Sequence, residues 1–223
     1  VPYCDGTAFT GDRDVDSDGD GNNDRFFRGI QNLSASLDVI ARTYPVPTRI
    51  LLAGNSAGGY GVHYALPLVR KLYPEVPIEL INDSGVGIQR PGSQELLNEY
   101  WNSASFFPAS CSSCIGDDGN LTDYHKYQLA EDENVRMGFI SSTADEVITG
   151  ESSIDPALFG EELIEAVAEL EQAYPERFRS LISYTDEHTY IIKQFGFGIG
   201  GTTVRQWVTD MLDHSDNWVS ASD

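Results

Sequence analysis

Short apolar runs alternate with amphipathic stretches of helical spacing along the chain. The apolar runs have the length of buried strands and lie at residues 48–53, 78–81, 135–140 and 179–184. Helical spacing of apolar positions is found at residues 30–44, 62–72, 158–174 and 203–212. Residues 86–125 show no clear period and are expected to be rich in loops. Strands and helices that alternate through short connections predict an α/β fold with a mainly parallel sheet flanked by helices, in one domain.

The segment Gly54-Asn-Ser-Ala-Gly58 lies where the first of these strands gives way to a helix. A G-x-S-x-G sequence at such a junction is typical of a nucleophile elbow. The tight turn favours small residues on both sides of Ser56, directs its hydroxyl to the carboxyl edge of the sheet, and aims the Ala57 amide at a developing oxyanion. The alternative is a glycine-rich turn in which the serine only caps the helix. The strand and helix around the segment favour the nucleophile.

Three ionisable residues follow other predicted strands by one short loop: Asp83, Asp145 and His188. Functional groups of parallel sheets gather at this edge. A triad of the α/β-hydrolase type runs serine, acid, histidine along the chain, which Ser56, Asp145 and His188 satisfy. The histidine would take the serine proton and the carboxylate would orient the imidazole. Asp83 and Glu146 remain rivals for the acid.

The other histidines fit the role of base less well. His63 lies on the helix after the elbow and is expected to be a packing or surface residue. His125 is expected in a polar loop. His214 lies at a helix C-terminus, where the helix dipole favours a cation. His188 is therefore the predicted base.

Acidic residues dominate the charge of the chain. Thirty-five Asp and Glu face 14 Lys and Arg, which gives a net charge of −21. This sign argues against nucleic-acid binding and against an anionic membrane surface. The charge fits either a strongly solvated surface or adaptation to high salt. The sequence also contains no apolar run long enough to span a membrane.

The chain has three cysteines, and two of them form the short segment Cys111-Ser-Ser-Cys114. This pair could form a disulfide, a redox couple or part of a metal site. No second pair with zinc-like spacing follows and no thioredoxin-like strand precedes it, so a structural disulfide is favoured. Cys4 would then be a free thiol or have a partner outside the chain.

An Asp-rich stretch at residues 14–24 reads D-x-D-x-D-G-x-x-D from Asp16 onward. This is the ligand spacing of an EF-hand-like calcium loop, in which alternate carboxylates converge on one hard cation. The twelfth position holds Phe27 instead of a bidentate acid, so another residue would complete the site. The alternative is a flexible acidic loop. The expected role of calcium is structural, and the expected ligands are Asp14, Asp16, Asp18, Asp20, Asn22 and Asp24.

Several segments of the chain form an ordered set that is more specific than any one motif. They are Pro2-Tyr-Cys4, Phe27-Arg-Gly29, Gly54-Asn-Ser-Ala-Gly-Gly59 with Gly61, Asp83-Ser-Gly85, Phe106-Phe-Pro108 beside the Cys-rich stretch, Ser142-Thr-Ala-Asp-Glu146 and His188-Thr. This set resembles the pectin acetylesterase/Notum family, and the resemblance extends from residue 1 to about residue 190. The resemblance implies an α/β-hydrolase fold and a secreted carboxylesterase that removes acetate from pectin or, in Notum, a fatty acyl group from Wnt proteins. It also implies Ser56 as nucleophile, Asp145 as acid, His188 as base and Ala57 as an oxyanion-hole amide.

The chain departs from the family at its start. The family has a Gly-Gly-Gly-Trp-Cys-like segment, with further oxyanion donors, before its Pro-Tyr-Cys strand, whereas this chain starts at Val1. We therefore expect residues 1–223 to be the C-terminal part of an α/β-hydrolase domain that lacks its N-terminal strands and needs an upstream segment of the same protein. Loss of one oxyanion donor typically costs about 10²–10³ in kcat. Residues 1–223 alone should then be nearly inactive, and full esterase turnover would contradict this expectation.

The expected function is hydrolysis of O-acyl esters through an acyl-enzyme, by an esterase that is extracellular or periplasmic and uses no cofactor in catalysis. An acetylated polysaccharide such as pectin is the first expected substrate. Apolar and aromatic residues within 86–108 could instead line an acyl pocket, so a lipase or polyester hydrolase remains an alternative. The alternative from another class is a non-catalytic, calcium-dependent carbohydrate-binding or structural module.

Overall fold

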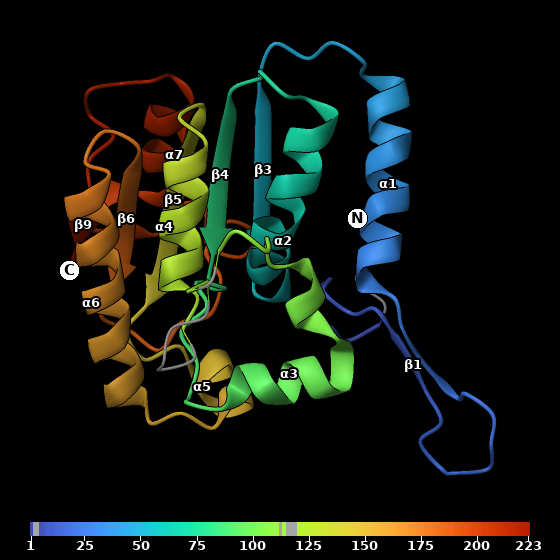
Figure 1. The fold of residues 1–223 in the computed structure, drawn as a ribbon. Coiled ribbons are helices and arrows are strands. Elements are labelled where there is room, and N and C mark those ends of the chain that lie inside the picture. Colours follow the sequence, from blue (N-terminus) through green and yellow to red (C-terminus); the bar gives the residue numbers. More distant parts are fainter. Residues whose placement is uncertain (2–4, 112, 115–119) are drawn as a thin grey trace.

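A five-stranded parallel sheet forms the centre of the molecule. The computed structural model describes residues 1, 5–111, 113–114 and 120–223. The strands lie in the order β3-β4-β5-β6-β9, and every neighbouring pair is parallel. Their carboxyl ends therefore lie at one edge of the sheet (Figure 1). The bounds are Ile50–Asn55 for β3, Ile78–Asp83 for β4, Val135–Ser142 for β5, Phe178–Ser183 for β6 and Ala221–Ser222 for β9.

Helices cover both faces of this sheet. The first face packs against α1 (Gly29–Thr43), α2 (Ala57–Leu72), α4 (Thr122–Glu131) and α6 (Pro156–Ala173). The second face packs against α7 (Val204–Leu212), whose Trp207 and Met211 are fully buried. Alternate residues of β4 serve the two faces, since Leu80 lies in the first cluster and Ile81 in the second. This arrangement confirms the predicted α/β-hydrolase-like class.

Smaller elements surround the carboxyl edge of the sheet. They are α3 (Ser93–Trp101), the 3₁₀ helix η1 (Ser103–Phe106), α5 (Glu146–Ser152) and the two-stranded pair β7 (Gly198–Ile199) and β8 (Thr202–Thr203). An antiparallel hairpin of β1 (Arg13–Val15) and β2 (Arg25–Phe27) projects from the body of the molecule (Figure 1). The Asp-rich stretch forms the tip of this hairpin.

Residues 86–125 contain the expected loops, together with α3, η1 and the start of α4, which were not predicted. Helix α4 was not recognisable from its period, since it buries Tyr124, His125 and Gln128 beside Leu129. Polar side chains on a buried face hide the apolar stripe on which such predictions depend. A disulfide joins Cys111 and Cys114, as expected. Cys4 and the predicted strand end at residues 2–4 lie outside the described residues.

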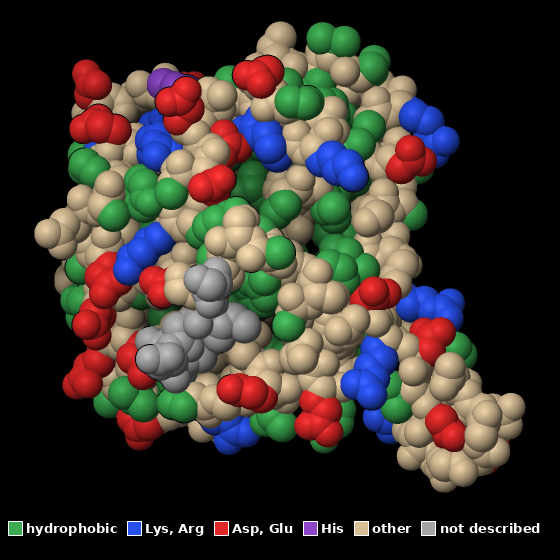
Figure 2. Space-filling view, viewed as in Figure 1, with side chains coloured by type: hydrophobic (Ala, Val, Ile, Leu, Met, Phe, Trp, Pro, Cys, Tyr) green, Lys and Arg blue, Asp and Glu red, His purple; other side chains and the backbone are tan. Residues whose placement is uncertain are grey.

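The surface carries the acidic character of the composition. Asp and Glu side chains are spread over the face shown in Figure 2 and do not gather in one patch. Among the described helices, none combines the length and the apolar character needed to cross a membrane.

Candidate active site

Ser56 occupies the sharp turn between β3 and α2. Its backbone angles are φ 53° and ψ −122°, which L-residues rarely adopt. A serine is held in such a conformation only when its surroundings determine it, and strained residues of this kind cluster at functional sites. The predicted strand–turn–helix context of the elbow is therefore present.

Close main-chain contacts explain why the turn contains glycines. A Cβ on Gly54 would lie 2.0 Å from the carbonyl oxygen of Gly58, and one on Gly85 would lie 2.4 Å from that of Ser56. At Gly59 a Cβ would lie 2.5 Å from Oδ1 of Asn82. A Cβ on Gly58, by contrast, would point into open space. The expectation of small residues on both sides of the serine thus has a steric basis at Gly54 but not at Gly58.

The main chain of the turn is fixed to the neighbouring strand. The Ser56 amide donates to the carbonyl oxygen of Asp83 at 2.7 Å, across the β3–β4 pair. The Asn82 side chain donates to the carbonyl oxygens of Gly59 and Gly85, at 3.0 and 2.8 Å, and accepts from the Gly85 amide at 2.8 Å. The end of β4 therefore holds the first turn of α2 in place.

His188 and Asp145 form a hydrogen-bonded pair. Nδ1 of His188 lies 2.9 and 2.8 Å from the two carboxylate oxygens of Asp145. The Asp145 side chain is fully buried, and that of His188 is 9% exposed. A proton on Nδ1 donated to the carboxylate leaves Nε2 free to accept one, which is the tautomer a general base requires.

Asp145 is also the N-cap of α5. Its Oδ1 accepts the amides of Val147 and Ile148, at 3.1 and 3.0 Å. These bonds fix the rotamer of the carboxylate, so the N-terminus of α5 orients the group that orients His188.

The rival acid Asp83 has other partners. Its buried carboxylate accepts the amides of Tyr190 and Ile191, at 2.9 and 2.8 Å, just after His188 in the chain. Burial raises the pKa of Asp83, while these amide hydrogen bonds oppose the rise. Sequence reasoning identified Asp83 only as an alternative acid; its position at the end of a strand was the signal for a role at this edge.

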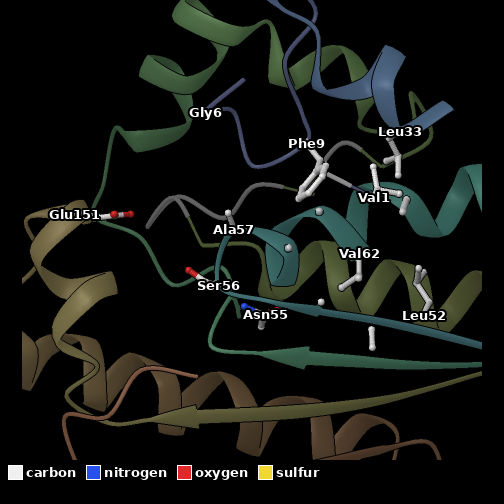
Figure 3. A pocket seen from close by; sticks show the side chains of 15 residues that line it. Val1, Gly6, Phe9, Leu33, Leu52, Asn55, Ser56, Ala57, Val62 and Glu151 are labelled. Carbon is white, nitrogen blue, oxygen red and sulfur yellow. The ribbon is translucent and has the colours of Figure 1, made fainter. Parts of the chain in front are cut away.

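Ser56 and Ala57 line two adjoining cavities. One, of about 720 Å³, extends along β3 and contains Phe9, Leu33, Leu52 and Val62 (Figure 3). The other, of about 310 Å³, lies under α3 and α5. Ala57 is the first residue of α2, so its amide has no intrahelical acceptor and lies at the positive end of the helix dipole. The residues lining the smaller cavity are Gly6, Ala8, Ser56, Ala57, Tyr60, Gln89, Arg90, Ser93, Leu96, Leu97, Trp101, Ile148, Glu151 and Ser152.

The remaining histidines lie away from the Asp145–His188 pair. His63 is buried in α2 as a packing residue, with Nε2 2.7 Å from Nδ2 of Asn82 and Nδ1 3.2 Å from Oε1 of Gln128. His125 was wrongly expected in a loop. It is buried in α4, and its ring lies against that of His63 at a tilt of 40°, with the centroids 4.0 Å apart. His214 follows α7, as expected, and its Nε2 donates to the Glu79 carboxylate at 2.9 Å.

The tip of the β1–β2 hairpin gathers part of the predicted calcium ligand set. Carboxylate oxygens of Asp16, Asp18 and Asp20 lie within 4.8 Å of one another. Asp14 stands outside this group, because its carboxylate forms a salt bridge with Arg28. Asp24 accepts the amide of Ser17 at 2.8 Å and its hydroxyl at 2.6 Å, while the Asn22 amide donates to Asp20. The donor set of hard carboxylate oxygens suits calcium.

Comparison with known proteins finds a family match over the first part of the chain. The family model described as pectinacetylesterase matches residues 1–110, about half of the chain. The resemblance to the pectinacetylesterase family is confirmed over these residues. No curated protein matches the chain significantly in sequence. The family supports a hydrolase of the carboxylesterase type. The matched range includes Ser56 and Asp83 but ends before Asp145 and His188, whose pairing is seen only in the structure.

Proposed function

We propose that the protein is a secreted serine carboxylesterase that removes acyl groups, acetate first among them, from O-acylated polysaccharide. The observation that carries the proposal is the His188–Asp145 pair at the sheet edge where Ser56 occupies a strained elbow. In this proposal Ser56 is the nucleophile, His188 the base and Asp145 the acid. The pectinacetylesterase family supports an ester substrate.

The reaction follows from the chemistry of these groups. Nε2 of His188 takes the proton of the Ser56 hydroxyl as Oγ attacks the acyl carbonyl carbon. The carbonyl oxygen becomes an oxyanion, to which the Ala57 amide donates. The C–O bond to the alcohol breaks, and the alcohol leaves with the proton held by His188. Water then attacks the acyl carbon while His188 takes its proton. The ester bond to Oγ of Ser56 breaks, His188 returns the proton to Oγ, and the carboxylic acid leaves.

The residues that line the two cavities at Ser56 indicate which classes of substrate could bind. The smaller one mixes polar side chains, such as Gln89 and Arg90, with Leu96 and Trp101. A polar sugar with a small acyl group suits such a lining. The larger cavity also has apolar side chains along one wall, those of Leu33, Leu52 and Val62. A longer acyl chain, as in a lipid or polyester, is therefore the second candidate.

A fluorophosphonate probe tests the mechanism in the full-length protein. The wild type should be labelled and should hydrolyse p-nitrophenyl acetate, and Ser56→Ala should lose both. Ser105→Ala is the control, because Ser105 lies in η1 outside both cavities and its loss should leave labelling unchanged. A wild type that is neither labelled nor active would favour a non-catalytic carbohydrate-binding or structural module. Release of acetate from acetylated pectin, compared with release of longer acids from lipid esters, then tests the substrate class.

We also propose that the hairpin tip binds calcium for structure. Asp16, Asp18 and Asp20 would supply carboxylate oxygens, and Asn22 and Asp24 lie in the same loop. Calcium should raise the melting temperature, and EDTA should reverse this. Asp18→Ala with Asp20→Ala should abolish the effect, whereas Asp14→Asn should not, since Asp14 pairs with Arg28. A melting temperature that calcium and EDTA leave unchanged would refute the site.

Export from the cytoplasm forms part of the proposal. The Cys111–Cys114 disulfide supports it, because such bonds persist in oxidising compartments. Immunodetection of the protein in the medium or periplasm of the producing cells tests this, and recovery from the cytoplasm alone would contradict it.

A further inference from the structure

Asp83 is the last residue of β4, and its side chain is fully buried at the carboxyl edge of the sheet. Within the part of the chain that the structure describes, no Lys, Arg or His forms a salt bridge with it. Its carboxylate instead accepts main-chain amides, from Tyr190 at 3.1 and 2.9 Å and from Ile191 at 2.8 Å. A buried carboxylate is costly unless its hydrogen bonds compensate, so these two amides are strong determinants of the local conformation.

The neighbouring residue extends the same contact. Ser84 has a φ of 59°, and its Oγ accepts the amide of Thr189 at 3.1 Å. Three consecutive amides, those of residues 189–191, thus bind the side chains of Asp83 and Ser84. Thr189 also has a positive φ, of 64°. The chain directly after His188 is therefore held in an unusual conformation by the end of β4.

The main chain of Asp83 connects the end of β4 to the elbow at Ser56. Its carbonyl oxygen accepts the Ser56 amide at 2.7 Å. One residue therefore binds the elbow through its backbone and the His188 loop through its side chain. Neither of these bonds involves Asp145, which contacts His188 from the α5 side.

We propose that Asp83 is a positioning residue that sets the placement of His188 relative to Ser56; this rests on the proposed function. Proton transfer between a hydroxyl and an imidazole depends steeply on their separation, and a displacement of about 1 Å can cost about 10²-fold in rate. Asp145 fixes the rotation of the imidazole, and Asp83 fixes the backbone that carries it.

The test compares two buried acids of β4 in the full-length protein. In Asp83→Asn the remaining oxygen can still accept one main-chain amide. The new NH₂ group is itself a donor, so it cannot accept the amide of Tyr190 or Ile191 that the lost oxygen bound. We expect kcat for p-nitrophenyl acetate to fall about 10- to 100-fold, with KM changed less than about twofold and Ser56 still labelled by fluorophosphonate, only more slowly. Glu79→Gln is the control, because Glu79 is 1% exposed on the same strand but contacts His214 at the other end. The Glu79→Gln variant should be less stable than the wild type but should keep its kcat.

A second pair of variants separates positioning from folding. Ser84→Ala removes the hydroxyl that accepts the Thr189 amide and donates to Oδ1 of Asp83 at 3.4 Å, but it leaves the two amide bonds of the Asp83 carboxylate in place. It should lower kcat by a smaller factor. In a His188→Ala background, Asp83→Asn should cost almost nothing more, because its contribution acts through His188.

Unchanged kcat in folded Asp83→Asn, a kcat loss matched by Glu79→Gln, or a further loss in the His188→Ala background would each overturn the proposal. If Asp83→Asn does not fold, unchanged kcat in Ser84→Ala overturns it. These outcomes differ from failure of the proposed function, in which Ser56→Ala would keep activity or the wild type would have none, and which would remove this proposal as well.

Discussion

The carboxylate of Asp145 lies 2.8 Å from Nδ1 of His188 and at the same time caps helix α5. The carboxylate thus accepts the amides of Val147 and Ile148 in addition to its contact with the imidazole. In the proposed mechanism, catalysis and local folding therefore depend on the same side chain.

Asp145→Asn should separate these two roles. Asparagine can still cap α5, but it does not favour the Nδ1–H tautomer or stabilise the imidazolium, so kcat should fall about 10³- to 10⁴-fold with little change in melting temperature. Asp145→Ala should lose similar activity and, in addition, about 1 kcal/mol of stability through the lost cap. Steady-state kinetics and urea unfolding of both variants check this. Equal stability of the two variants would show that the cap contributes nothing.

The elbow glycines provide a matched pair. A Cβ at Gly59 would lie 2.5 Å from Oδ1 of Asn82 and 2.7 Å from Cα of Gly85, whereas one at Gly58 meets no atom within 4 Å. Gly59→Ala should therefore destabilise the protein by about 1–3 kcal/mol. Gly58→Ala should be neutral or stabilising by up to about 1 kcal/mol, since alanine is the better helix former. Denaturant unfolding decides between them, and a Gly58→Ala variant as unstable as Gly59→Ala would contradict the geometry.

The buried neighbours His63 and His125 should make the fold sensitive to acid. Burial lowers the pKa of His63 to about 4 and that of His125 well below its usual value. In the unfolded chain both titrate near pH 6.5, so the unfolded state binds more protons as the pH falls below about 6.5. The stabilisation that comes from keeping both imidazoles neutral is therefore fully present above about pH 6.5 and is lost as the pH falls towards 4. His63 contributes up to about 3 kcal/mol of this loss in the free energy of unfolding.

His125→Phe tests the origin of that decline. The substitution keeps an aromatic ring beside His63 and Phe139 and removes a buried Nε2 that has no hydrogen-bond partner among the described residues. The free energy of unfolding should then fall less between pH 7 and pH 4.5 than in the wild type. An unchanged pH dependence would place the acid sensitivity elsewhere.

Charged side chains at the smaller cavity should select among substrates. Arg90 and Glu151 both line it, and Figure 3 shows Glu151 on the side of Ser56 and Ala57. Glu151→Gln should lower KM for esters with an anionic alcohol group by a few-fold, and Arg90→Gln should raise it, with little effect on neutral esters. KM values for a matched pair of neutral and carboxylated aryl acetates provide the measurement. Parallel changes for both substrates would argue against an electrostatic role.

Much of the fold and of the candidate site follows from the sequence. Strands β4, β5 and β6 were recognisable because apolar runs such as 135–140 are buried on both faces of a parallel sheet. Strand β3 lies at an edge of the described sheet and is less buried, but its residues form a similar apolar run. The positions of Ser56, Asp145 and His188 after β3, β5 and β6 were visible for the same reason. The roles predicted for these three residues and for Ala57 remain to be tested by the variants above.

What the sequence could not show are contacts set by tertiary structure. Helix α4 was missed because its buried face is polar, and this misplaced His125 in a loop. The partners of Asp83 are amides more than 100 positions away, and no side-chain pattern marks an amide. Asp14 fitted the alternation of the calcium motif, but its pairing with Arg28 depends on the β1–β2 register.

The positive φ of Ser56 has a consequence for how such a protein changes under selection. Glycine adopts this conformation without strain, whereas for serine it costs about 1–3 kcal/mol of folding free energy. Under the proposed mechanism, a Ser56→Gly variant would be inactive yet fold at least as well as the wild type. Screens that reward yield or heat resistance alone would then favour loss of the nucleophile, so directed evolution of this chain must couple survival to turnover.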